Sequence, residues 1–146
     1  MIGIEFNTEE RKMLITRAGH PPLAFLRKNN VHWLSPSGLG LGLTNSSQFQ
    51  KHLKVQEIAL EDNDFIYIFT DGVVERMNAS DEEFGFQRLE SLLGDVDSDC
   101  TPKTFHRILK TTLEQFAENR VANDDSTSIA IRFRICAKDN LPLDSL

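Results

Sequence analysis

The pattern of apolar and polar residues divides the chain into a strand-rich first part and a more helical second part. Residues 65–69 (Phe-Ile-Tyr-Ile-Phe) are apolar at every position, which predicts a central strand covered on both faces. Shorter or alternating apolar runs predict further strands at residues 2–6, 12–18, 23–27, 31–34, 53–55 and 127–135.

Helical spacing of apolar residues follows the central strand. Thr101-Pro102 combines a capping residue with a proline at the first helical position, which predicts a long helix over 102–120. Shorter helices are expected at 73–77 and at 86–93, the second preceded by a capping box that begins at Ser80. Strands and helices are segregated rather than alternating, so we expect an α+β domain with a mainly antiparallel sheet covered by helices.

Composition and charge narrow the classes of protein. The chain has 146 residues, enough for one domain, and residues 137–146 have the composition of a polar tail. The net charge of −6 argues against nucleic-acid binding and against binding to an anionic membrane surface. No apolar stretch reaches the length of a membrane span, and the N-terminus lacks the regions of a signal peptide. Cys100 and Cys136 lack CxxC spacing, which favours reduced thiols in a cytoplasmic protein.

Two acidic segments flank predicted strands. Asp71-Gly72 follows the central strand, and Asn123-Asp124-Asp125 precedes the last one. If both strands belong to one sheet, Asp71 and Asp124 can meet and bind a hard divalent cation, which prefers oxygen ligands. Two solvated turns remain the alternative, because Asp-Gly is a common turn dipeptide. His20 lies beside Gly19 and Pro21. Two interpretations are open for it: a residue that lines a functional site, or a histidine with a structural role in a loop.

Several motifs occur together in an order that resembles a known family. The chain resembles the bacterial stage II sporulation protein E-type phosphatases, which are metal-dependent serine/threonine phosphatases of the protein phosphatase 2C superfamily. The resemblance covers roughly residues 2–134 and rests on these segments: Ala18-Gly19-His20-Pro21-Pro22, Gly38-Leu39-Gly40-Leu41-Gly42, Phe69-Thr70-Asp71-Gly72-Val73-Val74-Glu75, Phe84-Gly85 and Asp124-Asp125-Ser126-Thr127.

The resemblance implies a fold and a metal site. The fold is a β-sandwich flanked by helices in α-β-β-α layers, with two Mn²⁺ or Mg²⁺ ions at one end. By this likeness Asp71 and Asp124 are ligands of one metal, and Asp125 supports the site. Water activated by the metals attacks phosphorus directly, so no covalent protein intermediate is implied.

The resemblance also implies partners. Such phosphatases act on phosphorylated STAS-domain proteins, the antagonists of anti-sigma factors in bacterial signalling, and often follow a sensor or receiver domain. The family's earlier Gly-Asp-Phe/Tyr and Asp-Gly-His-Gly-like motifs, which supply the bridging metal ligand, are not found in this sequence. Residues 1–136 are therefore expected to be the C-terminal portion of a phosphatase domain, with an incomplete site.

Two other interpretations stay open at this stage. The chain is a non-catalytic module that binds a partner or forms a homodimer, or a sandwich unrelated to phosphatases. A partial sandwich is expected to expose an unpaired strand edge or an apolar face, which favours association of two copies.

Overall fold

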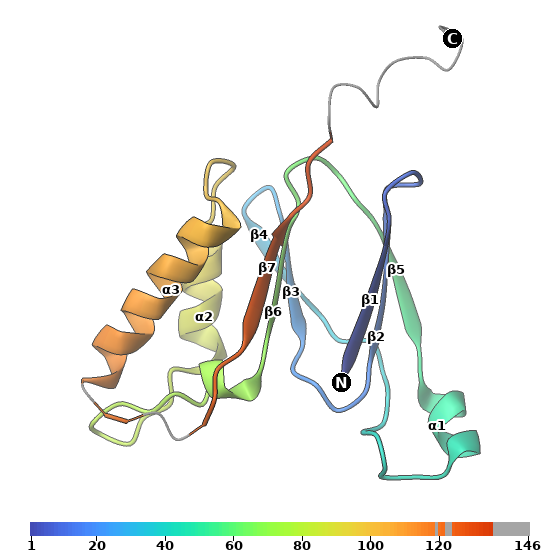
Figure 1. The fold of residues 1–146 in the computed structure, drawn as a ribbon, viewed down its shortest axis with the longest axis horizontal. Helices are drawn as coiled ribbons and strands as arrows, with labels where there is room; N and C mark the ends of the chain where they lie inside the picture. Colours follow the sequence, from blue (N-terminus) through green and yellow to red (C-terminus); the bar gives the residue numbers. More distant parts are fainter. Residues whose placement is uncertain (119, 122–123, 136–146) are drawn as a thin grey trace, which may run out of the picture.

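Two antiparallel sheets lie face to face, and two helices cover the outer face of one of them (Figure 1). The computed structural model describes residues 1–118, 120–121 and 124–135. The three-stranded sheet has the order β1-β2-β5, with bounds Ile2–Asn7, Lys12–Arg17 and Val55–Ala59. The four-stranded sheet has the order β4-β3-β6-β7, with bounds Asn30–Leu34, Leu23–Arg27, Phe65–Phe69 and Ser128–Arg132.

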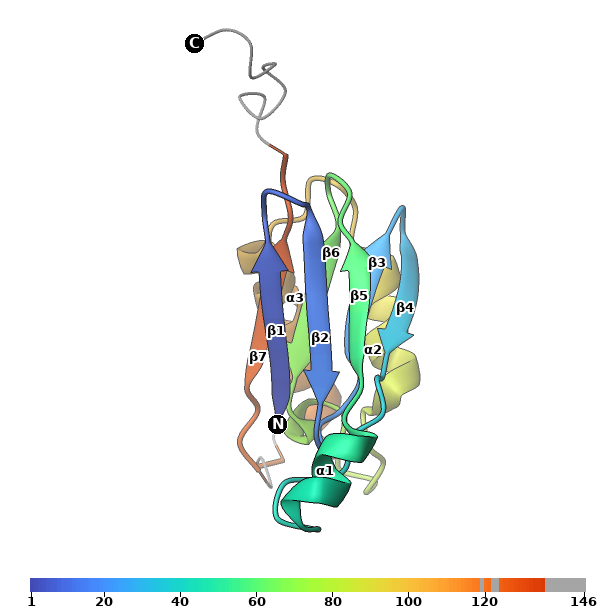
Figure 2. The same ribbon diagram turned by 90° about the vertical axis from the view of Figure 1, so that its right-hand side faces the viewer.

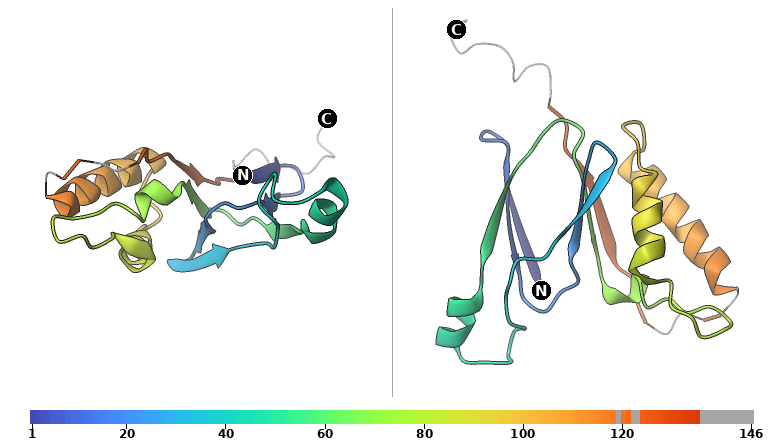
Figure 3. Two further views of the ribbon diagram at one scale, coloured as in Figure 1. Left: turned by 90° about the horizontal axis from the view of Figure 1, so that it is seen from below. Right: turned by 180° about the vertical axis from the view of Figure 1, so that it is seen from behind.

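The helices are unevenly distributed about the sandwich. Helices α2 (Gly85–Gly94) and α3 (Pro102–Ala117) pack on the four-stranded sheet. Helix α1 (Ser46–His52) lies on the other side, at one end of the three-stranded sheet (Figure 3). The expected α+β class is confirmed, and three of the four expected layers are formed by the described residues. In that part of the chain, none of the helices combines the length and apolarity needed to cross a membrane.

Strand β6 is the centre of the molecule, as its composition predicts. Phe65, Tyr67 and Phe69 contribute to an apolar cluster with residues of α2 and α3. Ile66, on the opposite face of the strand, joins Met13 and other residues of the cluster between the two sheets. Because side chains alternate along a strand, a strand that is apolar at every position can complete both clusters at once.

Helix α3 begins as its sequence predicts. The Thr101 hydroxyl oxygen accepts a hydrogen bond from the backbone N–H of Thr104 at 3.1 Å, and Pro102 occupies the first turn. This cap satisfies one of the N–H groups that have no partner within the helix. The helix ends at Ala117, three residues earlier than expected, because Glu118 adopts a left-handed conformation with φ of 48°.

Four local expectations were wrong in detail. Residues 71–73 form a 3₁₀ turn, η1 (Asp71–Val73), where a helix over 73–77 was expected. The strand expected at 53–55 lies at Val55–Ala59, and the last strand is shorter than expected. The expected capping box is not formed: the side chain of Asn78, rather than that of Ser80, accepts hydrogen bonds from the backbone N–H groups of this turn. Helix α1 was not expected at all.

The edges of the two sheets are aligned. Strands β1 and β7, each an edge strand among the described residues, lie on the same side of the sandwich (Figure 2). The N-terminus starts on this side, where the Met1 amino group donates to the Ala18 carbonyl oxygen at 2.7 Å. Cys136 and the expected tail at 137–146 lie outside the described residues.

Candidate metal-binding site

The end of β6 and the start of β7 bring the two acidic segments to one end of the four-stranded sheet. The strands are antiparallel, with Phe69 paired to Ser128. The pairing continues for one further residue, since the Thr70 N–H donates to the Thr127 carbonyl oxygen at 2.9 Å. Asp71 directly follows Thr70, and Asp124 precedes Thr127 by three residues, so both acidic segments adjoin the same end of this strand pair.

Each aspartate uses one carboxylate oxygen locally. The N–H of Gly72 donates to Asp71 Oδ1 at 3.2 Å, and the N–H of Asp125 donates to Asp124 Oδ1 at 2.7 Å. Within the described part of the chain, the second oxygen of each carboxylate has no hydrogen-bond partner. Both side chains are exposed to solvent. Each loop thus presents an oxygen of the kind that Mn²⁺ or Mg²⁺ accepts as a ligand.

The two acidic loops are joined by close contacts, which we call the loop clasp and define by Thr70, Gly72, Asp125, Ser126 and Thr127. The Ser126 hydroxyl donates to the Gly72 carbonyl oxygen at 2.8 Å. The Thr127 N–H donates to Thr70 Oγ1 at 3.0 Å. A Cβ added to Gly72 would lie 2.6 Å from the Asp125 carbonyl oxygen, so no larger residue fits without moving backbone. Gly72 is therefore needed for space.

The residues of the loop clasp were expected from the sequence only in part. Gly72 was expected to support the site, and it lies where the backbones of the two loops approach each other closely. Asp125 contributes its backbone carbonyl oxygen to the clasp. Thr70, Ser126 and Thr127 were quoted within the family motifs but were given no role in the site, although each lies within two residues of Asp71 or Asp125 in the sequence.

His20 takes no part in this constellation. It lies in the turn before β3, where its Nδ1 is 3.0 Å from the Pro21 carbonyl oxygen and its own carbonyl oxygen accepts from Arg17 Nη1 at 2.6 Å. Within residues 1–118, 120–121 and 124–135, no group of three or more His, Cys, Asp and Glu side chains is arranged to hold a metal ion.

The two glycine-containing motifs of the first half meet in space. A Cβ on Gly19, whose φ is 64°, would lie 3.1 Å from the Cα of Gly40. A Cβ on Gly38 would lie 1.8 Å from the Arg17 carbonyl oxygen. Close backbone packing thus holds the turn after β2 against the segment after β4.

A hollow beside the clasp separates it from α3. Its cavity measures about 300 Å³, and Val73, Leu109 and Leu113 give it an apolar lining. Two hydroxyl residues, Ser126 and Ser128, border it from the start of β7. Ser128 Oγ lies 3.1 Å from His106 Nε2, which ties the start of the strand to the helix.

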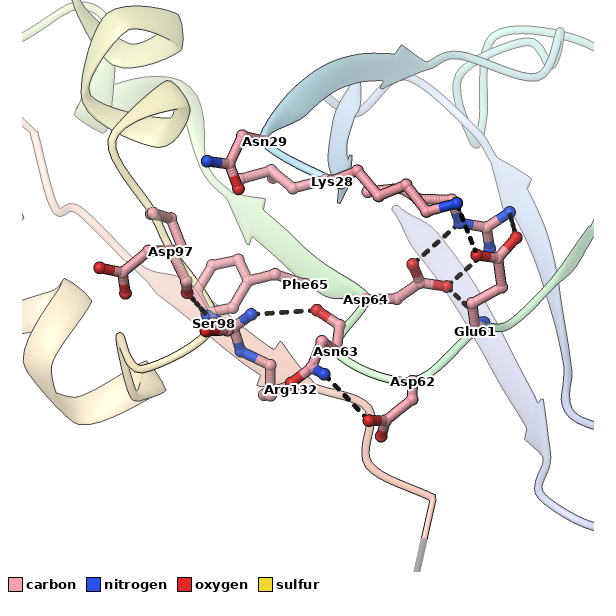
Figure 4. Close-up of a pocket in the computed structure, with 13 residues that line it drawn as sticks. Lys28, Asn29, Glu61, Asp62, Asn63, Asp64, Phe65, Asp97, Ser98 and Arg132 are labelled. Atoms are coloured by element: carbon pink, nitrogen blue, oxygen red, sulfur yellow. Dashed lines mark hydrogen bonds and ion pairs between the residues drawn. The ribbon is translucent and has the colours of Figure 1, made fainter.

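A second cavity of about 240 Å³ lies at the opposite end of β6 (Figure 4). Its buried carboxylate, Asp64, accepts from Arg27 Nε at 2.9 Å and from Arg27 Nη2 at 2.7 Å. The Arg132 guanidinium donates to the carbonyl oxygens of Asp97 and Cys100, each at 2.7 Å, and lies over the Phe65 ring. Asp64 is thus paired with Arg27, while Arg132 joins β7 to the segment between α2 and α3 through backbone carbonyl groups, so both contacts tie elements of the fold together.

Comparison with known proteins agrees with this arrangement. The family model of stage II sporulation protein E (SpoIIE) matches residues 1–134. The chain belongs to the SpoIIE family. No curated protein sequence matches it.

Solved phosphatase domains share its fold. The SpoIIE phosphatase domain of Bacillus subtilis, from a manganese-presoaked structure, is 14% identical with a TM-score of 0.67, covering 92% of this chain and 56% of that one. The SiaA-PP2C domain of Pseudomonas aeruginosa is 20% identical with a TM-score of 0.71, covering 85% and 47% respectively. The RsbU and RsbW domains of Rv1364c from Mycobacterium tuberculosis are 21% identical with a TM-score of 0.63, covering 91% and 35%. The chain therefore has a protein phosphatase 2C-type fold and spans between 35% and 56% of the length of these relatives.

Proposed function

We propose that this SpoIIE-family chain is the C-terminal portion of a metal-dependent phosphoserine and phosphothreonine protein phosphatase, within residues 1–136. The observation that carries the proposal is the loop clasp, which brings the Asp71 and Asp124 segments together in a fold shared with phosphatase domains. Asp71 and Asp124 are the residues that would hold one Mn²⁺ or Mg²⁺. When bound, a divalent cation supplies an activated water and polarises a phosphoryl oxygen.

The donor set of the chain fits part of such a centre. Two exposed carboxylates at one site repel each other unless a cation joins them, and each has an oxygen without a hydrogen-bond partner in the described residues. Two carboxylate ligands bind a divalent cation weakly, because such ions take six or more oxygen ligands, supplied by protein groups or water. We therefore expect weak metal binding and little turnover from this chain alone.

The substrate and the setting are part of the same proposal. We assign the chain to bacterial regulatory signalling in the cytoplasm, acting on a phosphorylated STAS-domain antagonist of an anti-sigma factor, downstream of a sensor or receiver domain. Two comparisons support a regulatory setting: the Bacillus subtilis relative is described as a cell fate determinant, and another relative combines RsbU and RsbW domains.

Calorimetric titration with Mn²⁺ tests the site. We expect saturable binding that is lost in Asp71→Asn and kept in Asp95→Asn, which removes an exposed carboxylate at the end of α2, away from the clasp. Hydrolysis of a phosphoserine protein in the presence of Mn²⁺ is measured in parallel. Equal Mn²⁺ binding by the chain and by Asp71→Asn would contradict the site. Robust turnover that depends on Asp71 would support the phosphatase function and contradict an incomplete site.

A non-catalytic role is the alternative, motivated by the missing upstream metal motifs. In that case the chain binds a STAS-type partner, or a second copy of itself, without hydrolysis. Retention of such a partner in a pull-down, unaffected by Asp71→Ala and by a chelator, would favour this role over the phosphatase.

A further inference from the structure

Ser126 occupies a special position in the loop clasp. Its hydroxyl donates to the Gly72 carbonyl oxygen at 2.8 Å, and this bond links the turn that carries Asp71 to the loop that carries Asp124. Gly72 directly follows Asp71, and Ser126 is two residues from Asp124. The bond therefore joins the backbone segments that carry the two candidate ligands, Asp71 and Asp124.

The hydrogen bonds between Thr70 and Thr127 join the two strands rather than the two acidic loops. Thr70 uses its backbone N–H and its hydroxyl oxygen on Thr127, which extends the pairing of β6 with β7 by one residue. These bonds fix the ends of the strands. The loops beyond them, where both aspartates lie, are joined by the Ser126 bond and by the close approach of Gly72 to the Asp125 backbone. The Thr70 hydroxyl adds a longer contact of 3.5 Å with the Asp125 carbonyl oxygen.

Exposed carboxylates on two loops need such a link. Without the cation their charges repel, which favours separation of the loops. A cation bound by both has to hold the loops at one distance, and any freedom between the loops lowers its affinity. Groups that orient metal ligands from behind typically change metal affinity by about 10- to 100-fold when they are removed.

We propose that Ser126 is a positioning residue that holds the Asp71 and Asp124 loops at the separation required for one divalent cation. The proposal rests on the proposed function, since it assumes that these two carboxylates bind the metal. It assigns to the Ser126 hydroxyl no contact with the metal or the substrate.

Three variants of the whole chain test it. Ser126→Ala removes the hydroxyl that bridges the loops. Ser126→Thr keeps a hydroxyl at the same, exposed position. Ser128→Ala is the matched control, because it removes a serine hydroxyl two residues further along that contacts His106 instead of the Asp71 loop.

The measurement is a Mn²⁺ titration followed by calorimetry and by paramagnetic broadening of backbone amide signals. In the unaltered chain, the amides of 71–73 and 124–127 should broaden at the same Mn²⁺ concentration. In Ser126→Ala we expect an affinity for Mn²⁺ that is about tenfold weaker. The amide signals of 71–73 and those of 124–127 should then broaden at different Mn²⁺ concentrations. Ser126→Thr should restore joint broadening, and Ser128→Ala should match the unaltered chain.

Two outcomes would overturn the proposal, and they are distinguishable. If the unaltered chain binds Mn²⁺ and Ser126→Ala binds it equally well, the positioning role is wrong while the metal site stands. If the unaltered chain shows no saturable Mn²⁺ binding, the metal site is wrong and the positioning role falls with it. A fall in affinity that is the same in Ser126→Ala and Ser128→Ala would show a general loss of stability and would also overturn the role.

Discussion

At the scale of single residues, Tyr67 shows how strongly the core of β6 is shielded. It is the one tyrosine of the chain, and its side chain is fully buried. Phe105 packs edge-on against its ring with centroids 5.0 Å apart, and Phe69 stacks on it at 5.4 Å. Burial disfavours the charged phenolate and raises the pKa of Tyr67 to about 12.

This shift predicts how stability depends on alkaline pH. Between the ordinary pKa of 10.0 and about 12, the unfolded chain loses the phenolic proton while the folded protein keeps it. Since the folded state binds more protons there, the free energy of unfolding falls as pH rises through this window, and the contribution is fully present below pH 10.

Ultraviolet absorbance of the phenolate measures the effect directly, because the signal has a single source. We expect ionisation of the folded protein near pH 12, with Tyr67→Phe showing no signal and a smaller alkaline loss of stability. Ionisation of the folded protein close to pH 10 would contradict the burial of this side chain.

At the scale of elements, the sequence best predicted the strands and helices in which a local sequence pattern coincides with burial of the side chains. Strand β6 is apolar at every position and fills both clusters, and Thr101-Pro102 starts α3 as expected. Helix α1 escaped prediction because it has no buried residue and so no apolar period. Its available signal was Asn45, whose side chain accepts from the Gln48 N–H.

The candidate site was predictable in part. The ends of two strands predicted that Asp71 and Asp124 would approach, and the register of β6 with β7 agrees with that expectation. The contacts of Ser126 and Gly72 could not be predicted, because they depend on the close approach of two backbones that lie far apart in the sequence.

Substitution of Gly72 tests the junction between η1 and the loop before β7. In Gly72→Ala the added Cβ would lie 2.6 Å from a backbone oxygen, so one loop has to move. We expect a loss of about 1–3 kcal/mol in the free energy of unfolding, measured by urea denaturation, together with weaker Mn²⁺ binding. Gly94→Ala is the control, because a Cβ there meets no atom within 4 Å. Equal stability of the two variants would contradict the tight junction.

At the scale of the whole molecule, helices cover the outer face of only one of the two sheets in the described residues. Helices α2 and α3 shield the four-stranded sheet, whereas no helix of the described residues lies across the outer face of β1, β2 and β5 (Figure 3). Strands β1 and β7 also present edges on the same side. Strand edges with exposed apolar residues favour pairing with another chain.

This arrangement predicts self-association. Ile129 on β7 is 52% exposed, and we expect Ile129→Lys to shift the protein toward monomer in sedimentation velocity, since a lysine on an edge strand opposes pairing. The control Ile108→Lys alters an apolar residue of α3 that is 42% exposed and lies away from any edge. A concentration-independent monomer that binds no apolar dye would contradict this expectation.

The pairing of β6 with β7 also sets the order in which the candidate site can form during folding. Strand β6 can pair with β3 before α2, α3 and β7 are synthesised, because both strands precede these elements in the chain. Asp124 reaches Asp71 only after α2 and α3 have been synthesised and β7 has closed a long loop back onto β6. Long-range contacts of this kind are slow to form, since the entropy lost on loop closure comes before the contacts. Acquisition of a cation by this pair would therefore report that the last strand is in place.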